Sequence, residues 1–165
     1  MKTSLEGKRC IVTGGSRNLG RAICLALARA GARVAFTYKE RDEEALETSR
    51  LLREAGVEPL ASKGAVFDPK HVNATIKAVE TAFGGIDILI NNAGLTQIMP
   101  IALIEEDEWD AVMDTNVKGA FLFSRAALRS MIRSKKGHIL NIGSFGADRI
   151  VVAGDRVLDV IGIAI

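Results

Sequence analysis

Residues 13–21, Thr-Gly-Gly-Ser-Arg-Asn-Leu-Gly-Arg, have the composition and spacing of a phosphate-binding turn. They lie between a short apolar run and an amphipathic segment, where a strand would join a helix. Gly14 allows a tight turn, and Gly20 allows the helix to pack closely on the strand. The backbone N–H groups at the helix start would then face an anionic diphosphate. A tight turn without a ligand is the alternative. A P-loop is excluded, because neither Lys-Ser nor Lys-Thr follows Gly20.

Two more polar clusters follow apolar runs that are typical of buried strands. The segment 91–94, Asn-Asn-Ala-Gly, follows the run 86–90, and Ser144 follows the run 138–142. The carboxyl ends of parallel strands lie at one edge of a sheet, and open parallel sheets bind their ligands at that edge. We therefore expect these clusters and the glycine turn to lie close together.

Asn116 lies in the middle of an apolar stripe on the amphipathic segment 106–134. The other residues of this stripe are Trp109, Val112, Met113, Val117, Ala120, Ser124, Leu128 and Met131. An asparagine in such a stripe must find hydrogen-bond partners, because an unpaired buried amide costs free energy. From spacing alone, a satisfied structural amide and a functional amide are equally good interpretations.

The elements that must position these residues alternate along the chain, which predicts an α/β fold with a doubly wound parallel sheet of about five strands. We expect strands at 10–14, 33–38, 58–66, 86–90 and 138–142, and helices at 18–30, 42–55, 69–83 and 106–134. The fold is expected to be incomplete on its C-terminal side. One dinucleotide-binding domain is predicted over 1–154, followed by a tail, 155–165, of unassigned structure.

Composition narrows the possible partners. The 165 residues are 48% hydrophobic and carry a net charge of +2 without long single-sign runs, so neither nucleic acid nor a membrane is an expected partner. Cys10 and Cys24 are expected to be buried and reduced, and His71 and His138 show no metal-ligand spacing. The N-terminus lacks the apolar core of a signal peptide, and no apolar run has membrane-spanning length. A soluble cytoplasmic protein without a metal site is expected.

The chain resembles the short-chain dehydrogenases/reductases, and most of all their 3-oxoacyl-carrier-protein reductase branch. The resemblance covers 7–154 and is carried by four ordered motifs, VTGGSRNLGRAI, DILINNAG, DTNVKGAF and GHILNIGS. It implies a Rossmann-like fold, a nicotinamide cofactor, and hydride transfer to a carbonyl, with a 3-oxoacyl thioester of fatty acid biosynthesis as the expected substrate. The substrate would be a small molecule or bound to a carrier protein.

The resemblance also implies roles for individual residues. Asn116 would anchor a water in the proton relay, and Ser144 would hydrogen-bond the substrate carbonyl. The residues expected at the cofactor are Gly14, Ser16, Arg17, Asn18, Leu19, Gly20, Tyr38, Lys39, Val66, Asn92, Ala93 and Gly94.

Two positions depart from the family pattern. Asn18 replaces the middle glycine of the turn, and we expect the turn to survive because asparagine tolerates a left-handed backbone. Ala65 stands near the usual place of an acidic residue that binds adenine. Val66, the neighbouring backbone and apolar packing are expected to hold the adenine instead.

The cofactor is predicted to be NADP (NADPH). Tyr38 occupies the place where an acidic residue would hold the ribose 2′-hydroxyl of NAD. Lys39, Arg41 and Arg17 supply positive charge that would bind a 2′-phosphate. Glu40 opposes this assignment, and we expect it to point outward.

The family's Tyr-x-x-x-Lys pair is expected shortly after Ser144, but neither a tyrosine nor a lysine follows that serine. We therefore expect this chain to be catalytically silent or nearly so. The alternative function is a catalytically inactive nucleotide-binding module or fragment. Family members form homodimers or homotetramers, and we expect that assembly to be disturbed here. The apolar stripe on 106–134 would be exposed, and the run 138–142 would form a sheet edge.

Overall fold

The computed structural model describes residues 4–96, 100–143, 151–153 and 156–158. The strands are β1 (Arg9–Val12), β2 (Arg33–Tyr38), β3 (Leu60–Lys63), β4 (Ile88–Asn91), β5 (His138–Asn141), β6 (Val151–Ala153) and β7 (Arg156–Leu158). The helices are α1 (Asn18–Arg29), α2 (Asp42–Glu54), α3 (Pro69–Phe83), α4 (Glu106–Met113) and α5 (Gly119–Ser134), with a 3-10 turn at Ile101–Leu103 and a π-helical turn at Asp114–Lys118. The predicted α/β alternation is confirmed, with boundaries that differ by a few residues.

Five strands form one parallel sheet in the order β3-β2-β1-β4-β5. The chain winds outward from β1 to β3 and then crosses back to β4 on the other side of β1. This reversal creates a switch point between the carboxyl ends of β1 and β4, which is where open α/β sheets bind their ligands. The predicted doubly wound, Rossmann-like sheet is therefore confirmed.

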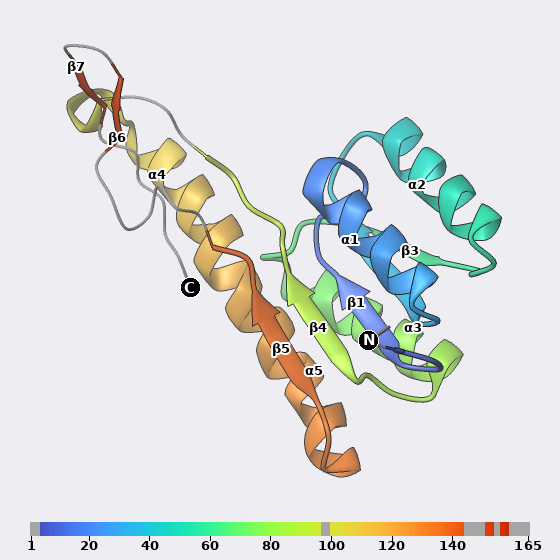
Figure 1. Ribbon diagram of the computed structural model, residues 1–165. Coiled ribbons are helices and arrows are strands. Elements are labelled where there is room, and N and C mark those ends of the chain that lie inside the picture. Colours follow the sequence, from blue (N-terminus) through green and yellow to red (C-terminus); the bar gives the residue numbers. More distant parts are fainter. Residues whose placement is uncertain (1–3, 97–99, 144–150, 154–155, 159–165) are drawn as a thin grey trace.

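Each face of the sheet has its own hydrophobic core, because successive strand residues point to opposite faces. Cys10 and Val12 of β1 pack with α1 and α2, whereas Ile11 packs with α3 and α5. Figure 1 shows α1 and α2 together, and α4 and α5 as one long helical column. Cys10 and Cys24 are fully buried, as expected, and burial raises the pKa of both thiols to about 12.

The amino end of the sheet is held by an ion pair between β1 and the residue before β4. The Arg9 guanidinium donates from Nε to Asp87 Oδ2 at 2.7 Å and from Nη2 to Oδ1 at 2.8 Å. The Arg9 backbone N–H adds a bond to Asp87 Oδ2 at 3.0 Å. These hydrogen bonds lower the pKa of the Asp87 carboxyl to about 2. A carboxylate held in this way aligns two central strands of the sheet.

The predicted helix over 106–134 contains an interruption. The segment Asp114–Lys118 forms a π-helical turn, and the N–H of Gly119 donates to the carbonyl of Asp114, five residues earlier. The apolar spacing is compatible with either kind of turn, because a single wide turn changes the helical periodicity only locally. π-helical turns often occur at functional sites.

The far edge of the five-stranded sheet is β5, as predicted. Its Leu140 is 46% exposed and the following Ile142 is 42% exposed. The expected exposure of the apolar stripe is only partly correct, since Trp109 and Leu128 are exposed but Met131 is buried. Met131 is covered because it packs in the core that α3 and α5 share.

A second sheet, which the sequence did not predict, consists of β6 paired antiparallel with β7. The predicted tail assignment, 155–165, lies largely outside the described residues. Among the helices that the structure describes, none is long and apolar enough to cross a membrane.

Candidate nucleotide-binding site

The glycine turn after β1 is held against β2 by hydrogen bonds. The N–H of Gly14 donates to Thr37 Oγ1 at 3.3 Å, and the N–H of Gly15 donates to the Thr37 carbonyl at 2.9 Å. Gly14 has a φ of +68°, which glycine adopts without strain. A Cβ at Gly20 would lie 2.1 Å from the Gly14 carbonyl oxygen, so the turn and α1 can pack this closely only with glycine there.

Asn18 adopts the left-handed conformation expected for a residue that replaces glycine. Its φ is +46°, and α1 begins at this residue. Arg17 before it is extended, with a φ of −152° and a ψ of 176°. The first N–H groups of a helix have no partner within the helix. The N-terminus of α1 can therefore donate to an anion.

The Ser16 carbonyl is the anchor of the turn, and its partners were not predicted. Arg21 donates to this oxygen from Nη2 at 2.8 Å, and the Thr48 hydroxyl of α2 donates at 2.7 Å. Arg21 Nε also donates to Thr48 Oγ1 at 2.8 Å. Arg21 and Thr48 gave no sequence signal, because both are ordinary helix residues and lie 27 positions apart.

The segment after β4 is tied to the same turn. The Thr13 hydroxyl accepts hydrogen bonds from the backbone N–H groups of Asn92 and Ala93, both at 3.0 Å. The side chain of Asn92 donates to the carbonyls of Thr13 at 3.0 Å and Gly14 at 3.1 Å. Two of the polar clusters predicted at the carboxyl edge of the sheet are thus bonded to each other.

Asn116, in the π-helical turn, bonds to the end of that segment. The N–H of Leu95 donates to Asn116 Oδ1 at 2.8 Å, and Asn116 Nδ2 donates to the Leu95 carbonyl at 2.9 Å. Both functions of the amide are therefore engaged with backbone. The side chain of Asn116 thus positions the segment 92–96.

A cavity of about 490 Å³ opens between the glycine turn, the end of β2 and the segment after β4. Its volume lies in the range of small-molecule and cofactor sites. Every cofactor residue predicted from the sequence lines this cavity, namely Gly14, Ser16, Arg17, Asn18, Leu19, Gly20, Tyr38, Lys39, Val66, Asn92, Ala93 and Gly94. Further lining residues are Thr37, Glu40, Arg41, Gly64, Phe67, Leu95, Ala111 and Thr115.

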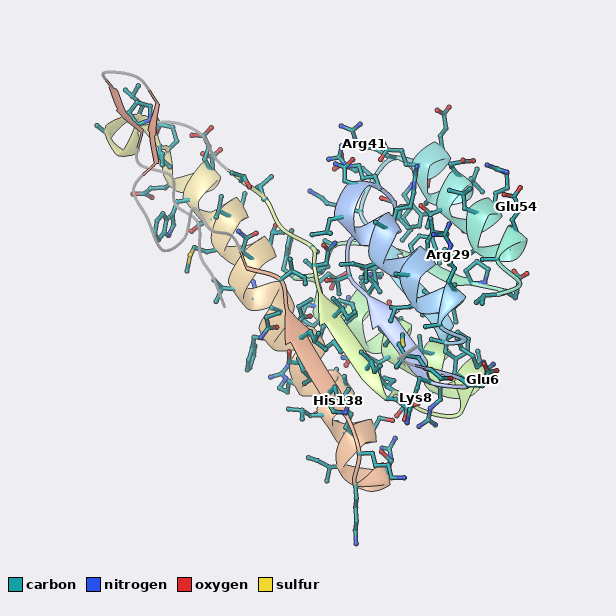
Figure 2. All side chains as sticks on the ribbon, in the orientation of Figure 1. Glu6, Lys8, Arg29, Arg41, Glu54 and His138 are labelled. Atoms are coloured by element: carbon teal, nitrogen blue, oxygen red, sulfur yellow. The ribbon has the colours of Figure 1, made fainter. Side chains whose placement is uncertain are left out.

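Positive charge gathers at the end of the cavity formed by β2 and the helix starts. Arg17, Lys39 and Arg41 line the cavity there, and Figure 2 shows Arg41 at the end of the molecule where α1 and α2 begin. Lys39 Nζ lies 3.5 Å from Glu40 Oε1. Glu40 also lines the cavity, although 73% of its side chain is exposed to solvent. Three cations can thus be offered to an anionic group.

Tyr38 and Lys63 both bond to Asp42, which does not line the cavity. The Tyr38 hydroxyl donates to Asp42 Oδ1 at 3.2 Å, and Lys63 Nζ donates to Asp42 Oδ2 at 2.6 Å. Burial and the hydrogen bond to Asp42 raise the pKa of the Tyr38 hydroxyl. Asp42 is thus already engaged by Tyr38 and Lys63.

Of the two predicted catalytic residues, Ser144 lies outside the described residues. Asn116 lies beside the cavity, where its Oδ1 would be 3.7 Å from a Cβ built on Gly94. Within the described part of the chain, no group of three or more His, Cys, Asp and Glu side chains is arranged to hold a metal ion.

A doubly wound sheet with a glycine turn at its switch point defines the class of dinucleotide-binding α/β domains. The family model for short chain dehydrogenase matches residues 8–154. The chain therefore belongs to the short-chain dehydrogenase family.

Similar curated proteins include bacterial reductases that are longer than this chain. The chain is 40% identical over 137 residues to the 3-oxoacyl-[acyl-carrier-protein] reductase FabG of Staphylococcus aureus, covering 83% of this chain and 56% of the relative. It is 39% identical over 146 residues to FabG of Vibrio cholerae, covering 86% and 56%. The chain thus spans a little over half the length of these relatives.

Solved structures are similar over most of the chain. A short-chain dehydrogenase/reductase from Mycobacterium marinum matches with a TM-score of 0.88 and 30% identity, covering 96% of this chain and 62% of that one. A short chain dehydrogenase from Burkholderia cenocepacia, solved in complex with NADP, matches with a TM-score of 0.83 and 37% identity, covering 91% and 60%.

Proposed function

We propose that residues 1–154 form a domain that binds NADP(H) for a short-chain oxidoreductase that reduces a carbonyl group. The observation that carries this proposal is the cavity of about 490 Å³ at the switch point, which joins a glycine turn to a cationic end. The NADP complex of the related Burkholderia cenocepacia protein supports the choice of cofactor.

The described residues fit such a cofactor. Gly14 and Gly20 leave room for close backbone approach, and the start of α1 would donate N–H groups to the diphosphate. Val66 and Phe67 would offer an apolar surface to the adenine. Arg17, Lys39 and Arg41 would receive a ribose 2′-phosphate, which accepts charge-assisted hydrogen bonds from guanidinium and ammonium groups. The bound cofactor would supply a hydride to the substrate carbonyl.

The substrate side of the proposal rests on the relatives. The similarity to 3-oxoacyl-[acyl-carrier-protein] reductases favours a 3-oxoacyl thioester, small or bound to a carrier. Within this chain, Asn116 would hold the segment 92–96 beside the reacting end of the cofactor, and Ser144 would hydrogen-bond the carbonyl. That the 165-residue protein turns over little or no substrate stays a prediction, which NADPH oxidation with an acetoacetyl thioester tests.

Titration of the protein with NADPH and with NADH, followed by calorimetry, tests the cofactor assignment. We expect tighter binding of NADPH. Arg17→Gln should weaken NADPH binding while leaving NADH binding nearly unchanged, because only NADPH carries the 2′-phosphate. Arg29→Gln, an exposed substitution in the last turn of α1, is the matched control. NADH binding as tight as NADPH binding would refute the preference.

A further inference from the structure

Glu44, in the first turn of α2, lies between two of the cations that line the cavity. Its Oε2 is 3.7 Å from Arg17 Nε, and its Oε1 is 3.4 Å from Arg41 Nη1. Arg17 belongs to the glycine turn and Arg41 to the connection between β2 and α2. One carboxylate thus bridges two arginines that come from different segments of the chain.

The backbone around Glu44 is fixed to the glycine turn. Arg21 Nη2 donates to the Glu44 carbonyl at 3.0 Å, and the same nitrogen donates to the Ser16 carbonyl. Arg41 precedes α2 in a left-handed conformation, with a φ of +65°, which costs free energy in residues other than glycine. The backbone of Glu44 is therefore tied to the glycine turn, and Arg41 starts from a defined backbone conformation beside it.

The contacts of the Glu44 carboxylate are nevertheless poor hydrogen bonds. Among the described residues, buried Oε2 finds no hydrogen-bond partner, and its distance to Arg17 Nε is too long for one. The bond to Arg41 is at the long end of the range. Ion pairs of this kind contribute little to stability. A phosphate, which accepts short bidentate bonds from a guanidinium group, would be a better partner for either arginine.

We propose that Glu44 is a specificity-determining residue that competes with the cofactor's 2′-phosphate for Arg17 and Arg41. The inference rests on the proposed function, and it adds a residue that weakens NADP(H) binding selectively. A 2′-phosphate would have to displace the carboxylate from the guanidinium groups and would be repelled by its charge. NAD(H), which has a free 2′-hydroxyl, can bind without displacing the carboxylate. Glu44 therefore reduces the difference in affinity between NADP(H) and NAD(H) that the cations create.

The test is to measure Kd for NADPH and NADH with wild type and with Glu44→Gln, which keeps the side chain's size and removes its charge. We expect NADPH to bind roughly three- to tenfold more tightly to the variant, from the loss of two weak ion pairs and one like charge. NADH binding should change less than about twofold. The gain should shrink at high salt, because the arginines are partly exposed.

Glu43→Gln is the matched control, since it removes the same charge from the neighbouring, exposed residue of the same turn. We expect little change in either Kd. Glu44→Met introduces an apolar side chain of similar length and should give the same selective gain in NADPH affinity. It serves as the test variant if Glu44→Gln does not fold. An equal gain in Glu43→Gln would show a general charge effect and overturn the inference.

Two other results separate this inference from the proposed function. If wild type prefers NADPH but Glu44→Gln and Glu44→Met bind it no more tightly, Glu44 does not compete and this inference alone is wrong. If NADPH binding weakens selectively in these variants, Glu44 supports the arginines and the inference is again wrong. Wild type that binds neither dinucleotide overturns the proposed function and this inference with it.

Discussion

The amide of Asn116 holds the backbone of Leu95 through a reciprocal pair of hydrogen bonds. One runs from the Leu95 N–H to Oδ1 at 2.8 Å and the other from Nδ2 to the Leu95 carbonyl at 2.9 Å. A residue of the π-helical turn is thereby joined to the segment that follows β4 and lines the cavity. The Asn116 side chain thus holds a backbone segment of the cavity wall, and its expected role in a proton relay stays a prediction.

Asn116→Ala should loosen this segment. The substitution leaves the N–H and the carbonyl of Leu95 without their side-chain partners. Both bonds are exposed, so water can replace these partners, and we expect the free energy of unfolding to fall by about 1 kcal/mol. Hydrogen exchange at the Leu95 amide should become faster, and NADPH binding should weaken. Asn116→Asp keeps an acceptor for the Leu95 N–H and should have a smaller effect on that exchange. Unchanged exchange in Asn116→Ala would contradict this role.

Gly20→Ala should damage the phosphate-binding turn more than the fold as a whole. The added Cβ would lie 2.1 Å from the Gly14 carbonyl oxygen, so α1 or the turn must shift. Overpacking of this kind costs roughly 1 to 3 kcal/mol, and we expect a loss of NADPH affinity of about tenfold. Gly56→Ala is the control, because its Cβ meets open space although its φ is +83°. It should lose some stability and keep its NADPH affinity, as calorimetry and thermal unfolding would show.

The ion pair of Arg9 with Asp87 should make stability depend on pH in acid. The pKa of Asp87 falls from the ordinary 3.8 to about 2, so the folded state binds fewer protons than the unfolded state between these values. The stabilisation is complete above the ordinary pKa and is lost as the pH falls through the folded value. Asp87→Asn should therefore lower the free energy of unfolding by about 2 kcal/mol near neutral pH. The difference from wild type should shrink towards pH 2.

Urea unfolding at a series of pH values measures this difference. Asp110→Asn, at an exposed position of α4, is the control and should differ little from wild type at any pH. A deficit in Asp87→Asn that stays constant down to the lowest pH would mean that the carboxylate charge is not its source.

Leu140→Lys should reduce self-association of the 165-residue protein. Leu140 is 46% exposed on β5, the edge strand of the five-stranded sheet, and exposed apolar edges pair with other chains. A lysine there disfavours such pairing. Sedimentation velocity at increasing protein concentration should show less association in Leu140→Lys than in wild type. Leu46→Lys, which changes a leucine on α2 that is 68% exposed, should leave association unchanged if β5 is the interacting edge.

Local pattern was sufficient for much of the fold. The strands and helices follow from apolar periodicity and from glycines at helix ends, because both depend on neighbours within a few residues. Asn18 could be placed in a left-handed conformation for the same reason, since the tolerance belongs to the residue type. The twelve predicted cofactor residues share one cavity because strand ends of a parallel sheet meet at one edge.

The partners of the turn could not be predicted, because they come from distant parts of the chain. Arg21 and Thr48 meet at the Ser16 carbonyl only once α1 and α2 lie side by side on one face of the sheet. The ion pairs of Glu44 depend on the same packing.

The sequence by itself determined the family, the order of the elements up to β5 and twelve of the residues that line the cavity, since motifs and periodicity are local properties of the chain. Only the tertiary structure decided the strand order, the π-helical turn and the hydrogen-bond partners of the Asn116 amide. The apolar pattern predicts a continuous α-helix over 106–134, and a π-helical turn, which is rare, carries no local signal that would replace that prediction. The hydrogen bonds to Leu95, 21 residues away, form only after β4 and the long helix have packed together.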